Sequence, residues 1–161
     1  PLRKPKMSVE SVRAFFQAHA PEFEVIESDK SSATVPLAAE AFGVKPEEIA
    51  KTLSLRVGER YVLVVTKGTA RLDNKKAKTA FGAKPRMLGA EEVVDITGHP
   101  VGGVCPFGLK TPLSVYCDIS LQAFDIVVPA AGSTNSAVRI PPQRMAELTS
   151  AEWVDVCQTQ D

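Results

Sequence analysis

The spacing of apolar residues predicts an amphipathic helix near the start of the chain and a β-hairpin after it. In residues 8–20, apolar side chains recur three and four positions apart, which is typical of a helix with one buried face. In residues 50–57 (AKTLSLRV), apolar and polar side chains alternate, which predicts a strand buried on one face. Residues 61–66 (YVLVVT) predict a second, more fully buried strand, and a Gly-Glu turn joins the two strands as a hairpin.

Capping and turn-forming residues predict the bounds of the other elements. Ser8, Thr34 and Asp73 are expected to cap helices at their N-termini. Gly43 and Gly82 are expected to follow helix ends. The remaining helices are expected at residues 34–42, 73–81, 90–97 and 141–148. The remaining strands are expected at residues 23–27, 86–88, 113–117, 125–130, 137–140 and 153–156.

This order of elements is not a regular alternation of strand and helix, so a doubly wound nucleotide-binding fold is not expected. The order instead predicts a mixed α/β (α+β) fold, in which helices surround a mixed, strongly bent sheet or partial barrel. We expect one domain over residues 8–161. Residues 1–7 (PLRKPKM) are basic and contain two prolines, which predicts a mobile tail.

Residues 97–109 (TGHPVGGVCPFGL) are unusual because they combine four glycines and two prolines with several apolar side chains. Proline removes amide donors and glycine has a large ordering entropy, so this segment is neither a helix nor a central strand. Its apolar residues predict a loop that folds back against the body of the domain. Glycine also leaves backbone amides bare, and such amides can donate hydrogen bonds to a developing oxyanion. A tight apolar connection between two elements is the alternative interpretation.

The charge of the chain is balanced in total but unevenly distributed. The formal net charge is zero, yet residues 67–86 hold seven basic side chains and one acidic side chain. A basic segment on an otherwise acidic body suits a polyanion such as RNA. A solvated helix face is the alternative interpretation of the same run. The candidate nucleic-acid contacts are Lys67, Arg71, Lys75, Lys76 and Lys78.

Composition excludes several classes of protein. A chain of 161 residues with 44% hydrophobic and 24% charged residues is expected to be a soluble globular domain. Three cysteines without metal-ligand spacing predict a reducing compartment, and we expect a cytoplasmic protein with no membrane partner. With only two histidines, neither a metal site nor a cofactor is expected. The phosphate-binding loop of NTPases, the dinucleotide-binding GxGxxG and the GxSxG elbow are not present in the sequence.

Two kinds of ester-cleaving chemistry remain. Lys51 lies at the start of a predicted strand, where it is either a surface lysine with a packed stem or a substrate contact. Together with the bare amides, its ammonium could hydrolyse an activated ester such as that of aminoacyl-tRNA. Alternatively, Cys105 and His99 share one loop and could form a nucleophile and base, as in a thioesterase or cysteine hydrolase. A buried cysteine that only packs is the simpler interpretation of Cys105.

Three motifs resemble the YbaK/ProX family, the free-standing relatives of the bacterial prolyl-tRNA synthetase editing domain. They are IAKTLSL around Lys51, VVTKGTARLDNKKA, and GHPVGGVCPFGL followed by a strand and an AGS loop. The resemblance runs from about Val25 to Gln158. It implies a trans-editing aminoacyl-tRNA deacylase whose mixed, barrel-like sheet is surrounded by helices.

The resemblance also implies roles for individual residues. Lys51 matches the family's lysine, which contacts the substrate carbonyl or the terminal phosphate. Residues 102–106 match the family's GxxxP loop, whose amides grip the aminoacyl ester. Residues 131–132 match the Ala-Gly of a second loop, but Ala130 stands where many relatives have serine. Ser133 or Asn135 is the candidate replacement for that serine.

The predicted site follows from these matches. Its expected catalytic residues are Lys51, Gly102 and Gly103. Its expected substrate contacts are Thr34, Thr52, His99, Val101, Val104, Cys105, Pro106, Phe107, Gly132 and Ser133. The implied substrate is a tRNA, tRNA-Pro or a related one, mischarged with Ala, Ser, Thr or Cys, and an aminoacyl-tRNA synthetase is a candidate partner. The alternative function is a non-catalytic module of the same fold that binds tRNA or a synthetase.

Overall fold

A long β-hairpin forms the centre of the structure. In the computed structural model, which describes residues 8–159, strand β2 (Ile49–Val57) pairs antiparallel with β3 (Arg60–Lys67). The six-stranded sheet continues in the order β4-β2-β3-β5-β8, and β5 and β8 run parallel to their neighbours. A further strand, β6, pairs parallel with the start of β2. The bounds of these strands are β4 (Arg86–Met87), β5 (Ser114–Asp118), β6 (Val128–Pro129) and β8 (Glu152–Val154).

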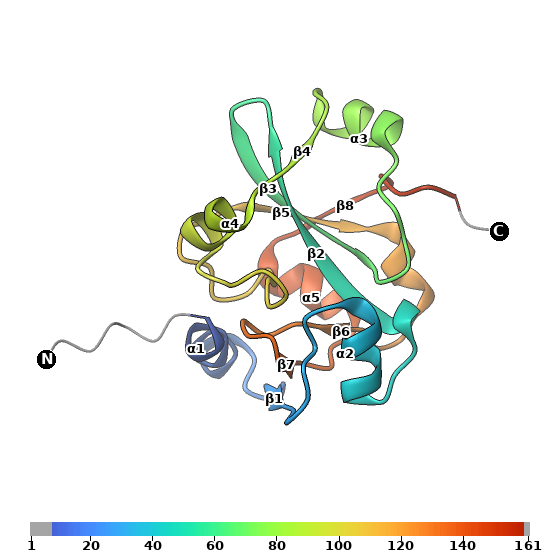
Figure 1. Ribbon diagram of the computed structural model, residues 1–161. Coiled ribbons are helices and arrows are strands. Elements are labelled where there is room, and N and C mark those ends of the chain that lie inside the picture. Colours follow the sequence, from blue (N-terminus) through green and yellow to red (C-terminus); the bar gives the residue numbers. More distant parts are fainter. Residues whose placement is uncertain (1–7, 160–161) are drawn as a thin grey trace, which may run out of the picture.

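Helices surround this sheet, and a small second sheet lies at one end (Figure 1). The second sheet pairs β1 (Ile26–Glu27) antiparallel with β7 (Ser136–Ala137). In Figure 1, α1 and α2 lie beside this small sheet, whereas α3 lies at the other end near β4. The α-helices are α1 (Val9–His19), α2 (Val35–Phe42), α3 (Asn74–Phe81), α4 (Ala90–Thr97) and α5 (Pro142–Thr149), and the 3-10 helices are η1 (Pro46–Glu48) and η2 (Ile119–Ala123).

The predicted fold class and most predicted elements are confirmed. Within residues 8–159 the structure is one mixed α/β domain, although its sheet stays open and does not close into a barrel. The amide of Leu37 donates to Thr34 Oγ1 at 3.3 Å, so Thr34 caps α2 as predicted. The amide of Lys76 likewise donates to Asp73 Oδ1 at 2.9 Å, so Asp73 caps α3 as predicted. Local capping signals therefore fixed these helix starts.

Some predicted details are wrong. The predicted strands at residues 125–130 and 137–140 shrink to β6 and β7, because the chain between them pairs only through isolated bridges. The 3-10 helix η2 was not predicted. Ser8 does not cap α1, since it has a positive φ of 75° and makes no capping hydrogen bond with its side chain. The predicted mobile tail at residues 1–7 lies outside the described residues.

The loop at residues 97–109 is built into the main hydrophobic core, as its apolar residues predict. The side chains of Cys105 and Phe107 are fully buried. The Phe107 ring packs on Phe16 of α1 with 4.7 Å between ring centroids. Val101 differs, because 57% of it is exposed. Among the described residues, no helix combines the length and the hydropathy that crossing a membrane would require.

The first turn of α1 holds two glycine loops in place. A Cβ on Gly108 would lie 2.6 Å from the backbone of Ser11, so only glycine fits there. The Ser11 hydroxyl also donates to the Gly108 carbonyl at 3.0 Å. A Cβ on Gly132 would lie 2.6 Å from the backbone of Ser8. These contacts fix the loops at residues 97–109 and 131–136 relative to the core.

A buried histidine joins the same region. His99 has no exposed surface, and its Nε2 lies 2.8 Å from the Phe107 carbonyl, which accepts a hydrogen bond from it. Burial lowers the pKa of His99 below its ordinary value of 6.5. The hydrogen bond to Phe107 raises the pKa, but its effect is smaller. The unfolded chain therefore binds a proton at His99 more readily than the folded chain.

We expect the free energy of unfolding to fall as the pH is lowered from 7 towards 5.5, because protons bind preferentially to unfolded His99 in this range. Urea unfolding of the wild type and of His99→Gln at several pH values measures this. The variant should lose less stability than the wild type over the same range. His19→Gln, at an exposed position at the end of α1, is the control and should behave as the wild type. An equal pH dependence in wild type and His99→Gln would contradict the assignment.

Candidate functional site

A cavity of about 250 Å³ lies between β2 and the segments that surround its free edge. Its walls come from β2, β4, β6, β7, α2, α4, residues 32–34 and the loop at residues 97–109. A second hollow, of about 470 Å³, lies between α3 and Asp155 on the surface. That hollow is open and contains no buried side chain that lacks a hydrogen-bond partner. We therefore take the cavity beside β2 as the candidate site.

The cavity exists because one edge of β2 is paired only at its ends. Its first residues pair with β6, at Ile49 and Ala50. Its later residues pair with β4, and the Ser54 carbonyl accepts from the Leu88 amide at 3.1 Å. Between these points, Thr52 faces the same edge, because alternate residues of a strand direct their main chain to the same side. The same alternation turns the N–H and C=O groups of Thr52 away from β3, and within residues 8–159 no backbone hydrogen bond outside the β2–β3 ladder reaches them.

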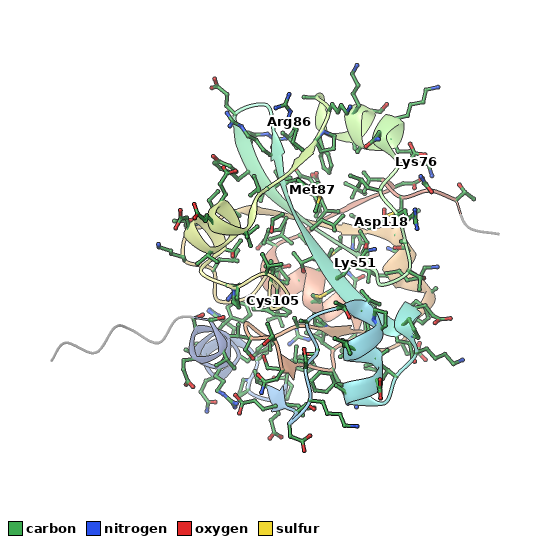
Figure 2. The ribbon with its side chains drawn as sticks, in the orientation of Figure 1. Lys51, Lys76, Arg86, Met87, Cys105 and Asp118 are labelled. Atoms are coloured by element: carbon green, nitrogen blue, oxygen red, sulfur yellow. The ribbon has the colours of Figure 1, made fainter. Side chains whose placement is uncertain are left out.

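Among the described residues that line the cavity, Lys51, which is labelled in Figure 2, is the only one with a charged side chain. Its ammonium donates to the Ala70 carbonyl, which fixes the direction of the side chain. Burial lowers the pKa of Lys51, Cys157 opposes this effect, and the positive charge of Arg71 lowers the pKa further. Lys51 is thus one of the residues that line the cavity, and its part in a reaction stays a prediction.

Gly102 lies in the cavity wall, where the loop meets the segment before α2. Its φ is +90°, and a Cβ at this position would lie 3.0 Å from Cβ of Ala33. Glycine is therefore required for both the backbone conformation and the close contact. Within the described residues, the Gly102 amide has no hydrogen-bond acceptor. It remains free to donate to a bound molecule.

Gly103 does not line the cavity, and this corrects a prediction. Its amide donates to the Pro100 carbonyl at 2.9 Å, so it is not available to an oxyanion. Its carbonyl accepts from the Gly132 amide at 3.0 Å. A Cβ on Gly103 would lie 2.8 Å from the backbone of Ser133. Gly103 and Gly132 therefore hold two loops together and do not contact a substrate from the cavity wall.

The structure brings some predicted substrate contacts to the cavity and leaves others away from it. The predicted contacts in the cavity wall are Thr34, Thr52, Val101 and Val104. The predicted contacts outside the wall are His99, Cys105, Pro106, Phe107, Gly132 and Ser133. The residues outside the wall lie in the loops at residues 97–109 and 131–136. One side of these loops faces the cavity, and the other side packs into the domain.

Cys105 and His99 do not form a nucleophile and base for a substrate. Both side chains are fully buried, and His99 Nε2 is bound to the Phe107 carbonyl. Cys105 Sγ lies 3.7 Å from His99 Nε2. Burial raises the pKa of the Cys105 thiol to about 12, so the thiol stays protonated at neutral pH. The hypothesis of a cysteine hydrolase is therefore wrong.

Ser133 and Asn135 do not replace the serine that is absent at Ala130. The Ser133 hydroxyl lies 2.8 Å from Asn135 Oδ1 and 2.6 Å from the Ser136 hydroxyl, so it is bound within its own loop. The Asn135 amide donates to the Ser28 carbonyl at 3.0 Å. Ala130 itself lies in the cavity wall.

Sequence reasoning missed a serine in the cavity wall. Ser32 is 6% exposed, and its hydroxyl has no hydrogen-bond partner in the structure. The hydroxyl of Thr52 is also buried without a partner. Nothing in the sequence distinguishes Ser32 from its neighbour Ser31, because only the fold shows which of them turns inward. The apolar floor of the cavity was also not predicted, and it consists of Ala38, Phe42, Ile49, Val128 and Ala137.

The predicted RNA-contacting residues lie outside the cavity, on β3, on α3 and between them. Arg71, Lys75 and Lys78 are exposed. Lys76 differs, since its ammonium pairs with Asp155 at 3.1 Å and donates to the Cys157 carbonyl at 3.0 Å. Lys67 is half-buried at the end of β3. Arg71 directly follows Ala70, whose carbonyl accepts from the Lys51 ammonium, so this basic surface begins next to Lys51.

The cavity offers binding groups and no nucleophile that is activated by a base. Among the described residues of its wall are one lysine and several residues with hydroxyl groups, but none with a carboxylate. Within residues 8–159, no three His, Cys, Asp or Glu side chains come together as a metal site would require. Such a wall can orient a carbonyl group and stabilise negative charge that develops on its oxygen.

Comparisons with known proteins extend over most of the chain. Residues 29–148 match the family described as the aminoacyl-tRNA editing domain. YwhH of Bacillus subtilis, an uncharacterized protein, is 48% identical over 154 residues, which are 94% of this chain and 98% of YwhH. EbsC of Enterococcus faecalis, named as a Cys-tRNA(Pro)/Cys-tRNA(Cys) deacylase, is 29% identical over 121 residues, which are 73% of each chain.

A solved structure shows the same fold. A protein described as a trans-editing enzyme for prolyl-tRNA synthetase superimposes with a TM-score of 0.88 at 30% identity. The superposition covers 98% of this chain and 100% of that one. The resemblance that the motifs around Lys51 and the glycine loop indicate is therefore confirmed, and the chain belongs to the aminoacyl-tRNA editing domain family.

Proposed function

We propose that this protein hydrolyses the ester bond between a small amino acid and a tRNA that carries it wrongly. The observation that carries the proposal is one small cavity whose wall includes Lys51, with an ammonium held by the Ala70 carbonyl, and Gly102, with an amide that has no acceptor among the described residues. The family match and the names of EbsC and of the trans-editing structure support the same reaction.

The ester itself supplies much of the reactivity. Water attacks the ester carbonyl carbon, the bond to the ribose oxygen breaks, and that oxygen takes a proton from the attacking water. Negative charge collects on the carbonyl oxygen during the attack. We infer that the ammonium of Lys51 and the amide of Gly102, two residues of the cavity wall, stabilise this charge, which is most effective where water is excluded. The Ala70 carbonyl holds Lys51 in position before the substrate arrives.

The size of the cavity favours a small amino acid. A volume of about 250 Å³ must hold the aminoacyl group and part of the terminal nucleotide. The floor is lined by short side chains such as Ala38, Val128 and Ala137. We infer that Ala, Ser, Thr or Cys is the amino acid removed. The names of EbsC and of the trans-editing structure support tRNA-Pro or a related tRNA as the carrier.

The basic surface supplies the contact with the body of the tRNA. Arg71, Lys75 and Lys78 are exposed, and phosphate contacts by such residues position a nucleic acid without reading its sequence. Lys76 contributes less, because Asp155 already neutralises it. Lys67, at the end of β3, extends the same surface. An aminoacyl-tRNA synthetase is a candidate partner that delivers the mischarged tRNA to this surface.

Removing the Lys51 charge is expected to lower kcat/KM for mischarged tRNA by at least about tenfold, or ~1.4 kcal/mol of transition-state stabilisation. Lys51→Met keeps most of the packed stem and deletes the ammonium, so the fold should survive. The measurement is release of labelled amino acid from a panel of charged tRNAs. Lys110→Ala, at an exposed position outside the cavity, is the control and should retain the wild-type rate. An unchanged rate in Lys51→Met would exclude the mechanism, and tRNA binding without any ester cleavage would favour a non-catalytic module.

The reaction is expected to have a pH dependence set by Lys51. Burial lowers the pKa of Lys51 below its ordinary value of 10.5, so the ammonium is lost at lower pH than in an exposed lysine. The ratio of the catalysed to the uncatalysed rate should therefore decline as the pH rises from 7 towards 10. Lys51→Met should show no such decline. A ratio that is constant in the wild type would contradict a role for the ammonium.

The Gly102 amide can be tested through the backbone around it. Gly102→Ala should reduce deacylation at least about tenfold, because a Cβ collides with Ala33 and strains a positive φ. Gly58→Ala is the matched control, since it strains a φ of +62° in open space on the hairpin turn. Thermal unfolding and deacylation of both variants separate the effects. Equal losses of activity in the two variants would show that deacylation does not depend on the backbone of Gly102 in particular.

A further inference from the structure

Thr52 directs three unpartnered polar groups towards the cavity. Its N–H and C=O lie in the gap of the β2 edge between the pairing with β6 and the pairing with β4. Its Oγ1 is buried and has no hydrogen-bond partner. Buried polar groups without partners are rare in proteins and each is costly, so a cluster of them in a cavity indicates a bound polar group.

Ser32 supplies a fourth such group from another part of the chain. Its hydroxyl lines the same cavity, is buried, and has no partner. The Ser32 amide donates to the Thr134 carbonyl at 2.6 Å, which fixes its backbone. Its neighbour Ala33 contacts Gly102, so Ser32 lies close to the loop that carries the free amide. The two hydroxyls therefore belong to one preformed wall.

Depth in the cavity decides which part of the substrate these groups meet. Ser32 is 6% exposed, whereas Met87 and Val101 on the rim are 63% and 57% exposed. A tRNA is far too large to enter, so its nucleotides stay near the rim. The aminoacyl group is the part that reaches the buried hydroxyls.

The α-amino group is the polar group of the substrate that still needs partners. The ester carbonyl is accounted for by Lys51 and Gly102. No carboxylate lines the cavity among residues 8–159, so we expect neutral acceptors to hold an amine there. The Thr52 carbonyl is an unpartnered main-chain acceptor, and hydroxyls can accept as well as donate.

We propose that Thr52 and Ser32 bind the free α-amino group of the aminoacyl ester, so that the site selects esters of α-amino acids. This inference rests on the proposed deacylase function and adds to it a requirement on the substrate. An ester without an amine leaves the Thr52 carbonyl and both hydroxyls unpaired. An N-acylated ester removes N–H donors and adds bulk, so peptidyl and formylated esters are excluded.

The test compares three esters on one tRNA, which is acylated with alanine, with propionic acid or with N-acetylalanine. Each rate with enzyme is divided by the spontaneous rate of the same ester, because the amine also activates the ester chemically. The wild type should accelerate the alanyl ester at least about tenfold more than either of the other two, as expected when a site built for hydrogen bonds loses its partner.

Two variants assign the effect to the proposed residues. Ser32→Ala and Thr52→Val each delete one unpartnered hydroxyl and keep the main chain. They should lower the acceleration of the alanyl ester and leave that of the propionyl ester unchanged. Thr111→Val is the matched control, because its hydroxyl donates to the Ile96 carbonyl outside the cavity. It should keep the wild-type ratio between the two esters. Thermal unfolding confirms that each variant is folded.

The outcomes separate the inference from the proposed function. Equal acceleration of all three esters by the wild type would overturn amine recognition while the deacylase function stands. The wild type could accelerate the alanyl ester more than the propionyl ester while both variants lose acceleration of the two esters equally. That result would overturn the assignment to Ser32 and Thr52. If the wild type hydrolyses no ester on any tRNA in the panel, the proposed function fails and this inference fails with it.

Discussion

The structure depends on one interruption of backbone pairing. Strand β2 pairs with β3 from Ala50 to Val57, but its other edge pairs with β6 at the start and with β4 near the end. Main-chain groups of a buried strand normally find partners, so an edge left open at Thr52 must be used by something else. The cavity, the ammonium of Lys51 and the unpartnered groups of Thr52 all follow from this gap. A β-sheet thereby supplies binding groups without any specialised side chain.

Close glycine contacts keep the walls of this gap in place. Gly103 and Gly132 join two loops by a direct backbone hydrogen bond, and Gly108 packs on the backbone of Ser11 in α1. A side chain at any of these positions would separate the segments that it touches. The loop at residues 97–109 can therefore present the free amide of Gly102 on one side, while its other side packs into the hydrophobic core. Rigid support of this kind is what allows a main-chain group to act as a preorganised donor.

Local signals in the sequence predicted much of the fold but only part of the site. Thr34 and Asp73 cap helices because a cap needs only its own neighbours. Lys51 could be placed at the start of a strand for the same reason. In contrast, Gly102 and Gly103 are adjacent and identical in the sequence, yet only one faces the cavity. Ser32 could not be found at all, because its inward direction depends on segments distant in the chain.

The most direct test of the central claim is a structure of the protein with an alanyl-adenosine analogue whose ester is replaced by a stable amide. The account predicts that the analogue's carbonyl oxygen lies about 3 Å from Lys51 Nζ or the Gly102 amide, with its amine at the open edge of β2. A complex in which the analogue binds elsewhere, or in which its carbonyl is turned away from both groups, would contradict the account.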